Sequence, residues 1–380
     1  MKKIERLGEY ISEYSVRNKD NEDIQVYSVT NTNGFCTEYF DKDVASKDQT
    51  NYKIVPKGYF AYNPSRINVG SIDCQSVEDR VIVSPLYVVF KADERVDNNY
   101  LLHYLKSDIG KTYINELASG SVRANLKFSI LQEFPFPMIP IEEQKEKMAV
   151  IAKIDESIAC CDSIIEKLDL AVKSRFIEMF GDNDKKVAIS SLCDVLGGYS
   201  FKSEDISSKG FIKILQIGNV YLDDVNWETT NYLPKEFDNK YSKFLLNEGD
   251  IVIALTRPII QSLGNVKACI VKASDTPCLL NQRVGRIVSK KNVDVNLQFI
   301  YGCLVTDDFT RYVESCCIGC SQPNISTKDI ENYMIPDASY EKQMDFVKFK
   351  EQIDKSKLAV QEMKNKMEIL KASVMQEYFC

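Results

Sequence analysis

Two arginines occupy matching loops, one in each half of the 380-residue chain. Arg66 follows a short apolar run that begins after Gly58, and Arg257 follows one that begins after Gly249. Glycine at such a position permits the tight turn that precedes a strand. A guanidinium forms two parallel hydrogen bonds with a planar polar edge such as that of a nucleobase, so these loops could read a nucleic acid. An exposed loop residue or a surface ion pair would look the same in sequence.

Other side chains suited to such contacts are amides, hydroxyls and arginines in nearby polar loops. Asparagine and glutamine pair with adenine edges, and hydroxyls pair with several base groups. The candidate DNA-contacting residues are Tyr62, Asn63, Ser65, Arg66, Asn68, Arg123 and Asn125 in the first half, and Arg257, Gln261, Asn281, Gln282, Arg283, Gln322 and Asn324 in the second.

The charge of the chain is unevenly distributed. Its net value of −7 argues by itself against a nucleic-acid-binding protein. Residues 251–291, however, carry seven basic side chains against a single acid, Asp275. Because local potential and not total charge guides a polyanion, we expect a positive surface around this segment.

Residue types that catalysis or metal binding would need are sparse. His103 is the only histidine and lies in an apolar helical stretch, so it is expected to be a packing residue and not a general base. The only dense cysteine group, Cys316, Cys317 and Cys320, lacks the second spaced pair of a structural zinc site. The glycine pair at residues 197–198 is too short to form a glycine-rich cofactor-binding loop. We expect no metal, no cofactor and no intrinsic enzyme activity.

No apolar run approaches the ~20 residues that span a bilayer. The N-terminal residues also lack the apolar core of a signal peptide. We therefore expect a cytoplasmic protein with no membrane partner.

An internal repeat organises the chain. Residues 99–180 match residues 298–379 at one offset of 199 without a gap, so that Gln144 meets Gln343 and Phe180 meets Phe379. The preceding segments, 1–98 and about 186–297, differ in loop length. Around their glycine-led strands the offset is 191, where Arg66 meets Arg257. Two copies of one module in a single chain can bind a two-part target.

Each copy has the same predicted order of elements. Short runs rich in β-branched and aromatic residues, such as 53–62, 81–90, 250–255 and 284–288, predict strands. A helix is predicted over 99–116 and again over 297–316. Each copy then ends in a long helix, about 141–180 and 340–379, whose apolar residues recur every seven positions as in a coiled coil. The apolar stripe on the first of these helices is wide, which suggests a second contact, either with the chain's own domains or with another subunit.

The matching parts of the two copies resemble a known family. In the first copy the sequence runs from Gly120 through residues 136–137 (Phe-Pro) and 141–144 (Ile-Glu-Glu-Gln) to a helix that ends at Phe180. The second copy has Ile-Pro at 335–336, Glu-Lys-Gln at 341–343 and Tyr-Phe at 378–379. In their order and duplication these motifs resemble type I restriction–modification specificity subunits. The resemblance covers essentially the whole chain. The chain departs from the family pattern in its acidic net charge and in the fewer prolines of its second copy.

The resemblance implies an α/β (α+β) fold with a pseudo-twofold repeat. Residues 1–140 and 186–339 would be two globular target-recognition domains in tandem. Residues 141–181 and 340–380 would be long helices that form an antiparallel coiled coil.

The resemblance also implies that the chain is a non-catalytic protein that recognises a bipartite target in double-stranded DNA. Each domain would read one half-site. The helices would set a spacer near one helical turn, roughly 34 Å between half-site centres, and dock methyltransferase subunits, of which two are expected. Nuclease/translocase subunits would be further partners. The alternative is a coiled-coil adaptor that joins two proteins without reading DNA, and it would lack salt-dependent DNA affinity.

Overall fold

The computed structural model describes residues 3–37, 48–117, 125–317 and 323–379. The chain forms two compact units, of which unit 1 comprises residues 1–163 and 361–380 and unit 2 comprises residues 164–360. The boundaries between the units therefore fall within the two long helices and not at their ends. Among the described residues no helix is both long and apolar enough to cross a membrane.

Unit 1 is built on a four-stranded antiparallel sheet of order β2-β9-β6-β7, accompanied by the pairs β1-β10, β3-β4 and β5-β8. Its strands are β1 (Lys3–Arg6), β2 (Ile11–Glu13), β3 (Ser28–Thr30), β4 (Gly34–Cys36), β5 (Lys53–Pro56), β6 (Phe60–Tyr62), β7 (Ile72–Cys74), β8 (Arg80–Val83), β9 (Val88–Ala92) and β10 (Pro135–Met138). Its short helices are α1 (Asn98–Lys106), α2 (Asp108–Leu117) and α3 (Phe128–Leu131).

Unit 2 repeats this sheet as β12-β20-β15-β18 and adds a three-stranded sheet, β14-β13-β19, and the pairs β11-β21 and β16-β17. Its strands are β11 (Lys186–Ala188), β12 (Cys193–Gly197), β13 (Ile212–Leu215), β14 (Asn231–Leu233), β15 (Ile251–Ala254), β16 (Ile259–Ile260), β17 (Asn265–Val266), β18 (Ala268–Ile270), β19 (Cys278–Leu280), β20 (Val284–Ser289) and β21 (Met334–Pro336). Its short helices are α5 (Ile189–Leu192), α6 (Phe237–Lys240), α7 (Leu297–Leu304), α8 (Asp307–Cys316) and α9 (Thr327–Asn332).

The helices predicted over 99–116 and 297–316 are each broken in two, at equivalent hydroxyl residues. The Ser107 hydroxyl accepts a hydrogen bond from the backbone N–H of Gly110 at 3.2 Å, and Thr306 accepts one from Phe309 at 3.2 Å. A hydroxyl that bonds a backbone N–H three residues ahead starts a new helix and competes with the old one. The periodic pattern alone did not predict this break.

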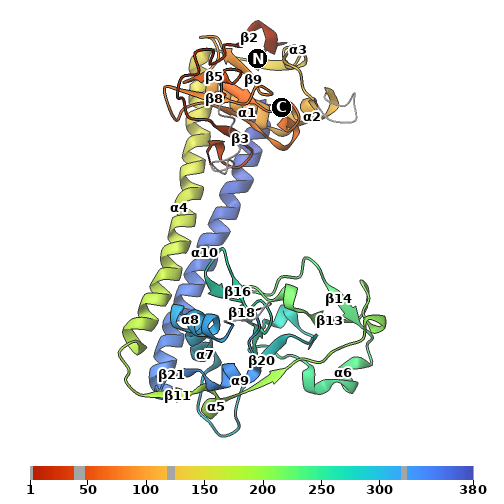
Figure 1. The fold of residues 1–380 in the computed structure, drawn as a ribbon, viewed down its shortest axis with the longest axis vertical. Helices are drawn as coiled ribbons and strands as arrows, with labels where there is room; N and C mark the ends of the chain where they lie inside the picture. The colour runs from red at the N-terminus through yellow and green to blue at the C-terminus, as the bar shows by residue number, and fades with distance from the viewer. Residues whose placement is uncertain (1–2, 38–47, 118–124, 318–322, 380) are drawn as a thin grey trace. The chain divides into compact units, whose positions relative to one another are not determined.

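The long helices are α4 (Ile141–Phe180) and α10 (Tyr340–Phe379). Within each unit their segments lie side by side and run antiparallel (Figure 1). Ion pairs link them at steps of seven residues: Lys371–Asp155 at 2.5 Å and Lys364–Asp162 at 2.6 Å in unit 1, and Lys357–Asp169 at 2.7 Å in unit 2. The predicted antiparallel coiled coil is thus confirmed in each unit, as is the α/β (α+β) class.

The ends of the long helices complete the cores of the two units. The ring of Phe379, at the end of α10, packs against Tyr100 of unit 1 with centroids 5.1 Å apart. The ring of Phe180, at the end of α4, packs against Phe299 of unit 2 at 4.9 Å. These two pairs are related by the offset of 199, so the sequence repeat is also a repeat of packing.

Buried glutamines repeat in the same way. Gln144 accepts a hydrogen bond from the backbone N–H of Asp97 at 2.8 Å and donates one to the carbonyl of Ile139 at 2.8 Å. Gln343 does the same with Asn296 and Ala338, both at 2.9 Å. Each amide fixes the start of a long helix to the start of a short helix, α1 or α7, where backbone groups would otherwise be buried without partners.

Candidate nucleic-acid interface

The loop that carries Arg66 is held at the end of β6. The backbone N–H of Leu126 donates to the carbonyl of Pro64 at 3.1 Å, which places Asn125 beside the loop. Within the loop, the Asn63 side chain accepts from the N–H of Ser65 at 3.0 Å, and Arg66 precedes a short 3₁₀ turn that ends at Gly70, φ +91°. Side chain–backbone bonds of this kind fix a loop without a neighbouring strand.

The polar side chains of this loop face solvent. Ser65, Arg66, Asn68 and Asn125 are exposed, and Asn63 is half-buried. Among the described residues none forms a hydrogen bond or ion pair with the Arg66 guanidinium. A free guanidinium on a fixed loop is available for a ligand with a planar acceptor edge.

Tyr62 has a different role from the predicted one. It is fully buried, and its hydroxyl donates to the carbonyl of Leu126 at 3.1 Å. Burial raises the pKa of Tyr62, so the phenol stays neutral. Because neither its ring nor its hydroxyl reaches solvent, Tyr62 supports the loop and does not touch a ligand. Aromatic residues occupy protein cores as well as interfaces.

The loop that carries Arg257 is held in the equivalent way at the end of β15. The backbone N–H of Ile325 donates to the carbonyl of Leu255 at 2.9 Å. This bond corresponds to the Leu126–Pro64 bond at both offsets, 199 for the donor and 191 for the acceptor. A further hydrogen bond runs from the N–H of Arg257 to the carbonyl of Pro323 at 2.7 Å. The exposed residue Asn324 forms an isolated antiparallel β-bridge with Thr256.

Two arginines of unit 2 have left-handed backbone conformations. Arg257 has a φ of +47° and Arg283 one of +67°. The N–H of Leu255 donates to the carbonyl of Arg283 at 2.8 Å, so both arginines lie at the same end of the paired strands β15 and β20. A left-handed backbone conformation costs free energy in residues other than glycine, and such residues concentrate at functional sites. Both side chains are exposed, and no described residue pairs with either guanidinium.

The remaining predicted residues are distributed differently. Gln282 and Gln261 are exposed. Asn281 is only 8% exposed, and its Oδ1 has no partner among the described residues. This burial contradicts a direct contact by Asn281. Arg123 and Gln322 lie outside the described residues.

Part of the basic segment 251–291 is neutralised inside unit 2. Arg286 is nearly buried and pairs with Asp250, Nε to Oδ2, at 2.8 Å. Lys272 pairs with Asp224 at 3.0 Å, and Lys290 with Asp194 at 3.7 Å. The segment therefore offers less positive surface than its sequence predicts, and its unpaired arginines are those at the end of β15 and β20.

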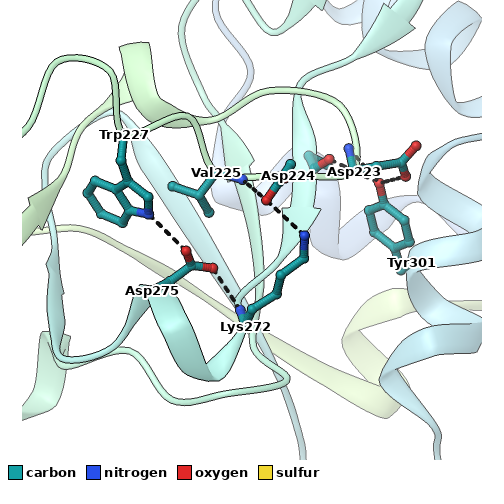
Figure 2. Close-up of polar contacts among 8 residues, drawn as sticks. Asp223, Asp224, Val225, Trp227, Lys272, Asp275 and Tyr301 are labelled. Atoms are coloured by element: carbon teal, nitrogen blue, oxygen red, sulfur yellow. Dashed lines mark hydrogen bonds and ion pairs between the residues drawn. The ribbon is translucent and has the colours of Figure 1, made fainter. Parts of the chain in front are cut away.

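A polar network fixes the strand next to β15. Figure 2 shows Tyr301 of α7 reaching the loop that contains Asp223: its hydroxyl donates to the Asp223 carboxylate at 2.5 Å, and it also bonds the carbonyl of Ala268 in β18 at 3.1 Å. Burial, and then the Asp223 carboxylate, raise the pKa of Tyr301, so it remains a donor. The helix, the loop and the strand are thereby joined.

The same loop is tied at a second point. The Trp227 indole N–H donates to Asp275 at 2.8 Å, while the other carboxylate oxygen of Asp275 accepts from the N–H of Lys272 at 2.8 Å (Figure 2). The side chain of Lys272 reaches back to Asp224. These bonds hold the sheet edge that supports the Arg257 loop, and sequence reasoning identified none of them.

Sequence reasoning also missed an exposed hairpin turn in unit 1, residues 31–33, between β3 and β4. The signal was present, since Asn33-Gly34 is a dipeptide typical of hairpins. Gly34 has a φ of +57°, as such a turn needs.

Comparisons with known proteins agree on one family. A family model described as "Type I restriction modification DNA specificity domain" matches residues 3–170 and 182–371. The Type I restriction enzyme MjaVIII specificity subunit of Methanocaldococcus jannaschii is 28% identical over 274 residues, which are 67% of this chain and 63% of that protein. The EcoAI specificity subunit of Escherichia coli is 34% identical over 150 residues, 39% of this chain and 24% of that protein. The match thus spans less than two thirds of either relative.

Solved structures share the fold. A chain from a structure of complex assembly and conformational transition of the type I R-M system has a TM-score of 0.63 at 15% identity, covering 99% of this chain and 97% of that one. An S subunit from M. genitalium has a TM-score of 0.50 at 14% identity, covering 100% and 96%. At these identities the similarity concerns the fold alone.

Proposed function

We propose that this chain, which belongs to the type I restriction modification DNA specificity family, selects a bipartite double-stranded DNA target for modification and restriction. Residues 1–140 and 186–339 are the two target-recognition domains, and each reads one half-site. The chain performs no chemistry itself and acts on DNA in the cytoplasm.

The equivalent support of the two arginine loops carries this proposal. Leu126 bonds Pro64 and Ile325 bonds Leu255, so Arg66 and Arg257 stand at matching places in two copies of one frame. Each guanidinium is exposed and unpaired among the described residues. Arginine in such a position suits the O6 and N7 edge of guanine. Two matching readers in one chain are what a two-part target requires.

The complex also needs surfaces for its other subunits, and we assign these to the long helices. Leu170 on α4 is 62% exposed and Ile369 on α10 is 70% exposed. The two are related by the offset of 199, so each unit presents an equivalent apolar side chain on a long helix. Exposed apolar residues at equivalent places favour two copies of the same partner. Those partners are two methyltransferase subunits, and nuclease/translocase subunits join the assembly through them.

The stoichiometry is testable in the purified complex by native mass spectrometry. Leu170→Glu and Ile369→Glu are each expected to remove one methyltransferase subunit, and the double variant both. Lys366→Glu, a charge change on the same helix as Ile369, serves as a control. If the single variants each lose both subunits or neither, the assignment of two equivalent surfaces is wrong.

The long helices also set the spacer between half-sites. A heptad inserted into both helices, after Ser163 and after Glu362, keeps the antiparallel register of the Lys–Asp pairs. At 1.5 Å per residue it lengthens the pair by about 10 Å, or about 3 base pairs of DNA. The spacer of the methylated motif should grow by that number, whereas an unchanged spacer would show that the helices do not measure it.

The central test is the pattern of adenine methylation, mapped by single-molecule sequencing in the source strain and in a strain without this chain. Loss of one bipartite motif is the expected result. Complementation with Arg66→Glu should change one half of the motif, and Arg257→Glu the other half. Equal loss at both halves would contradict the modular assignment.

The adaptor alternative predicts a different outcome. An adaptor complex would bind DNA weakly at any salt concentration, whereas a DNA reader loses affinity steeply as salt rises. An unchanged methylome together with salt-independent binding by the purified complex would favour the adaptor.

A further inference from the structure

The β3–β4 hairpin of unit 1 is a two-stranded antiparallel ribbon with a buried base and an exposed tip. Its register pairs Ser28 with Cys36 and Val29 with Phe35. Val29 is 3% and Phe35 6% exposed, since both face the core beside β8 and β9. The tip residues, Asn31, Thr32 and Asn33, are all exposed.

Three side chains from outside the hairpin anchor it. The Ser71 hydroxyl donates to the carbonyl of Val29 at 2.5 Å, and the Tyr87 hydroxyl accepts from the N–H of Val29 at 3.3 Å. On the other strand, Asp73 accepts from the N–H of Phe35 at 3.1 Å. Because both strands are held to the body by buried or half-buried bonds, the direction of the tip is fixed.

The fixed tip lies beside the loop that carries Arg66. A Cβ built on Gly70, where the 3₁₀ turn after Arg66 ends, would lie 3.3 Å from the Cβ of Asn31. Between hairpin and loop is a cavity of about 430 Å³, lined by the tip residues and by Asn63 and Arg66. None of the described residues that line it carries a carboxylate. The surface therefore combines one cation with several neutral amides and suits an uncharged polar edge beside an anionic backbone.

We propose that the β3–β4 hairpin is a second DNA-reading element of unit 1, which enters the major groove next to the Arg66 loop and reads base edges with Asn31 and Asn33. This inference rests on the proposed function and names the residues that give one half-site part of its sequence. Ser71, Asp73 and Tyr87 are its positioning residues.

The shape and chemistry of the hairpin agree with that role. The major groove of B-DNA admits a two-stranded β-ribbon, and asparagine forms a paired hydrogen bond with the N6 and N7 groups of adenine. The methyl group of Thr32, between the two amides, suits the methyl group of thymine.

At the offset of 191 the hairpin tip corresponds to residues 222–224 of unit 2, which form a turn between the antiparallel bridge residues Val220 and Val225. This turn lies in the connection between β13 and β14, residues 216–230, and it has Leu222, Asp223 and Asp224 where the hairpin has Asn31, Thr32 and Asn33. The half-site read by unit 1 should therefore contain an adenine–thymine position that depends on the hairpin.

The test uses the full chain assembled with its methyltransferase subunits. The complex selects from a library of duplexes with both half-sites randomised, and the bound DNA is sequenced. Asn31→Ala, Asn33→Ala and the double variant are compared with the control Asn99→Ala, an exposed asparagine on α1 of the same unit. Loss of a paired contact should weaken selection of one base pair by about 10- to 100-fold. The change should be confined to the half-site that Arg66→Ala also alters.

Other outcomes separate the two proposals. If Arg66→Ala changes a half-site but the double asparagine variant selects the wild-type motif with wild-type affinity, the hairpin is not a reader and the proposed function stands. If the hairpin variant changes the half-site that Arg257→Ala alters, the assignment to unit 1 is wrong. If the wild-type complex selects no bipartite motif, the proposed function itself fails. Equal thermal melting of all variants excludes loss of folding as the cause.

Discussion

The two units share one frame and differ in what the frame carries. In both, a glutamine amide clamps the start of a long helix, a phenylalanine from the end of the other long helix closes the core, and a backbone bond holds an arginine loop. In unit 1 the frame carries the anchored β3–β4 hairpin with an uncharged tip. In unit 2 the turn at the matching place, between Val220 and Val225, contains two aspartates and belongs to a loop fixed by the Asp223 and Asp275 bonds, and two arginines have left-handed backbones.

This difference shows where selection for a new target can act. The frame depends on buried polar groups that each satisfy two backbone partners, and loss of either partner is costly. The variable elements depend on surface loops attached to the four-stranded sheet, which tolerate changes of length and sequence. Under the proposed function, this division would let one chain read two unlike half-sites while its helical parts stay equivalent.

The largest expected effect comes from breaking the shared clamp. Gln144→Leu leaves the N–H of Asp97 and the carbonyl of Ile139 buried without partners, and Gln343→Leu does the same to Asn296 and Ala338. Each should lower the free energy of unfolding by about 3 kcal/mol. Urea unfolding measures the loss, and hydrogen exchange locates it in one unit. Gln361→Leu, at an exposed position on α10, is the control. A loss as small as in that control would show that the clamp is not part of the frame.

An exchange between repeats should have the next largest effect. His103 of unit 1 corresponds to Gly302 of unit 2, where a Cβ would lie 2.9 Å from a ring carbon of Phe176 and 3.2 Å from one of Phe346. Gly302→His forces these rings apart, and overpacking of this kind costs about 2 kcal/mol. Thermal unfolding measures it against Gly218→Ala, where no atom lies within 4 Å of the added Cβ. If Gly302→His is neutral, the aromatic packing of unit 2 is looser than these distances indicate.

A smaller effect is expected from loosening the β3–β4 hairpin of unit 1. Ser71→Ala removes the bond to the carbonyl of Val29, a loss of about 1 kcal/mol in unfolding free energy. Because the tip would then move, the selectivity of one half-site should relax while DNA affinity at low salt changes little. Selection from the duplex library measures the first and a salt titration the second. Ser129→Ala, at an exposed position of α3, controls for loss of a hydroxyl. Lost affinity without relaxed selectivity would contradict the positioning role.

The sequence predicted the shared frame better than the candidate DNA-contacting residues, for a physical reason. Packing and capping residues recur at fixed spacing, so Gln144 and Gln343 or Phe180 and Phe379 show themselves as a repeat. Whether a polar residue is buried depends on distant partners: Tyr62 is closed off by Leu126, Arg286 is neutralised by Asp250, and Asn281 lies below the surface. The hairpin anchors Ser71 and Asp73 lie 42 and 38 residues from their partners. No local pattern contains such contacts.

The smallest expected effect is a difference in pH dependence that follows from the exchange of histidine for glycine between the repeats. Burial lowers the pKa of His103, although its Nδ1 lies 2.9 Å from the carbonyl oxygen of Asn99. The unfolded chain therefore takes up a proton near pH 6.5 before the folded chain does, and unit 1 loses stability as pH falls from about 6.5 through the lower folded pKa. Unfolding free energies measured at pH 7.5 and 5.5 should differ more for the wild type than for His103→Gln. Because His103 is the only histidine and carboxylates titrate near pH 4, an equal difference in both proteins would mean that the ring is as well solvated when folded as when unfolded.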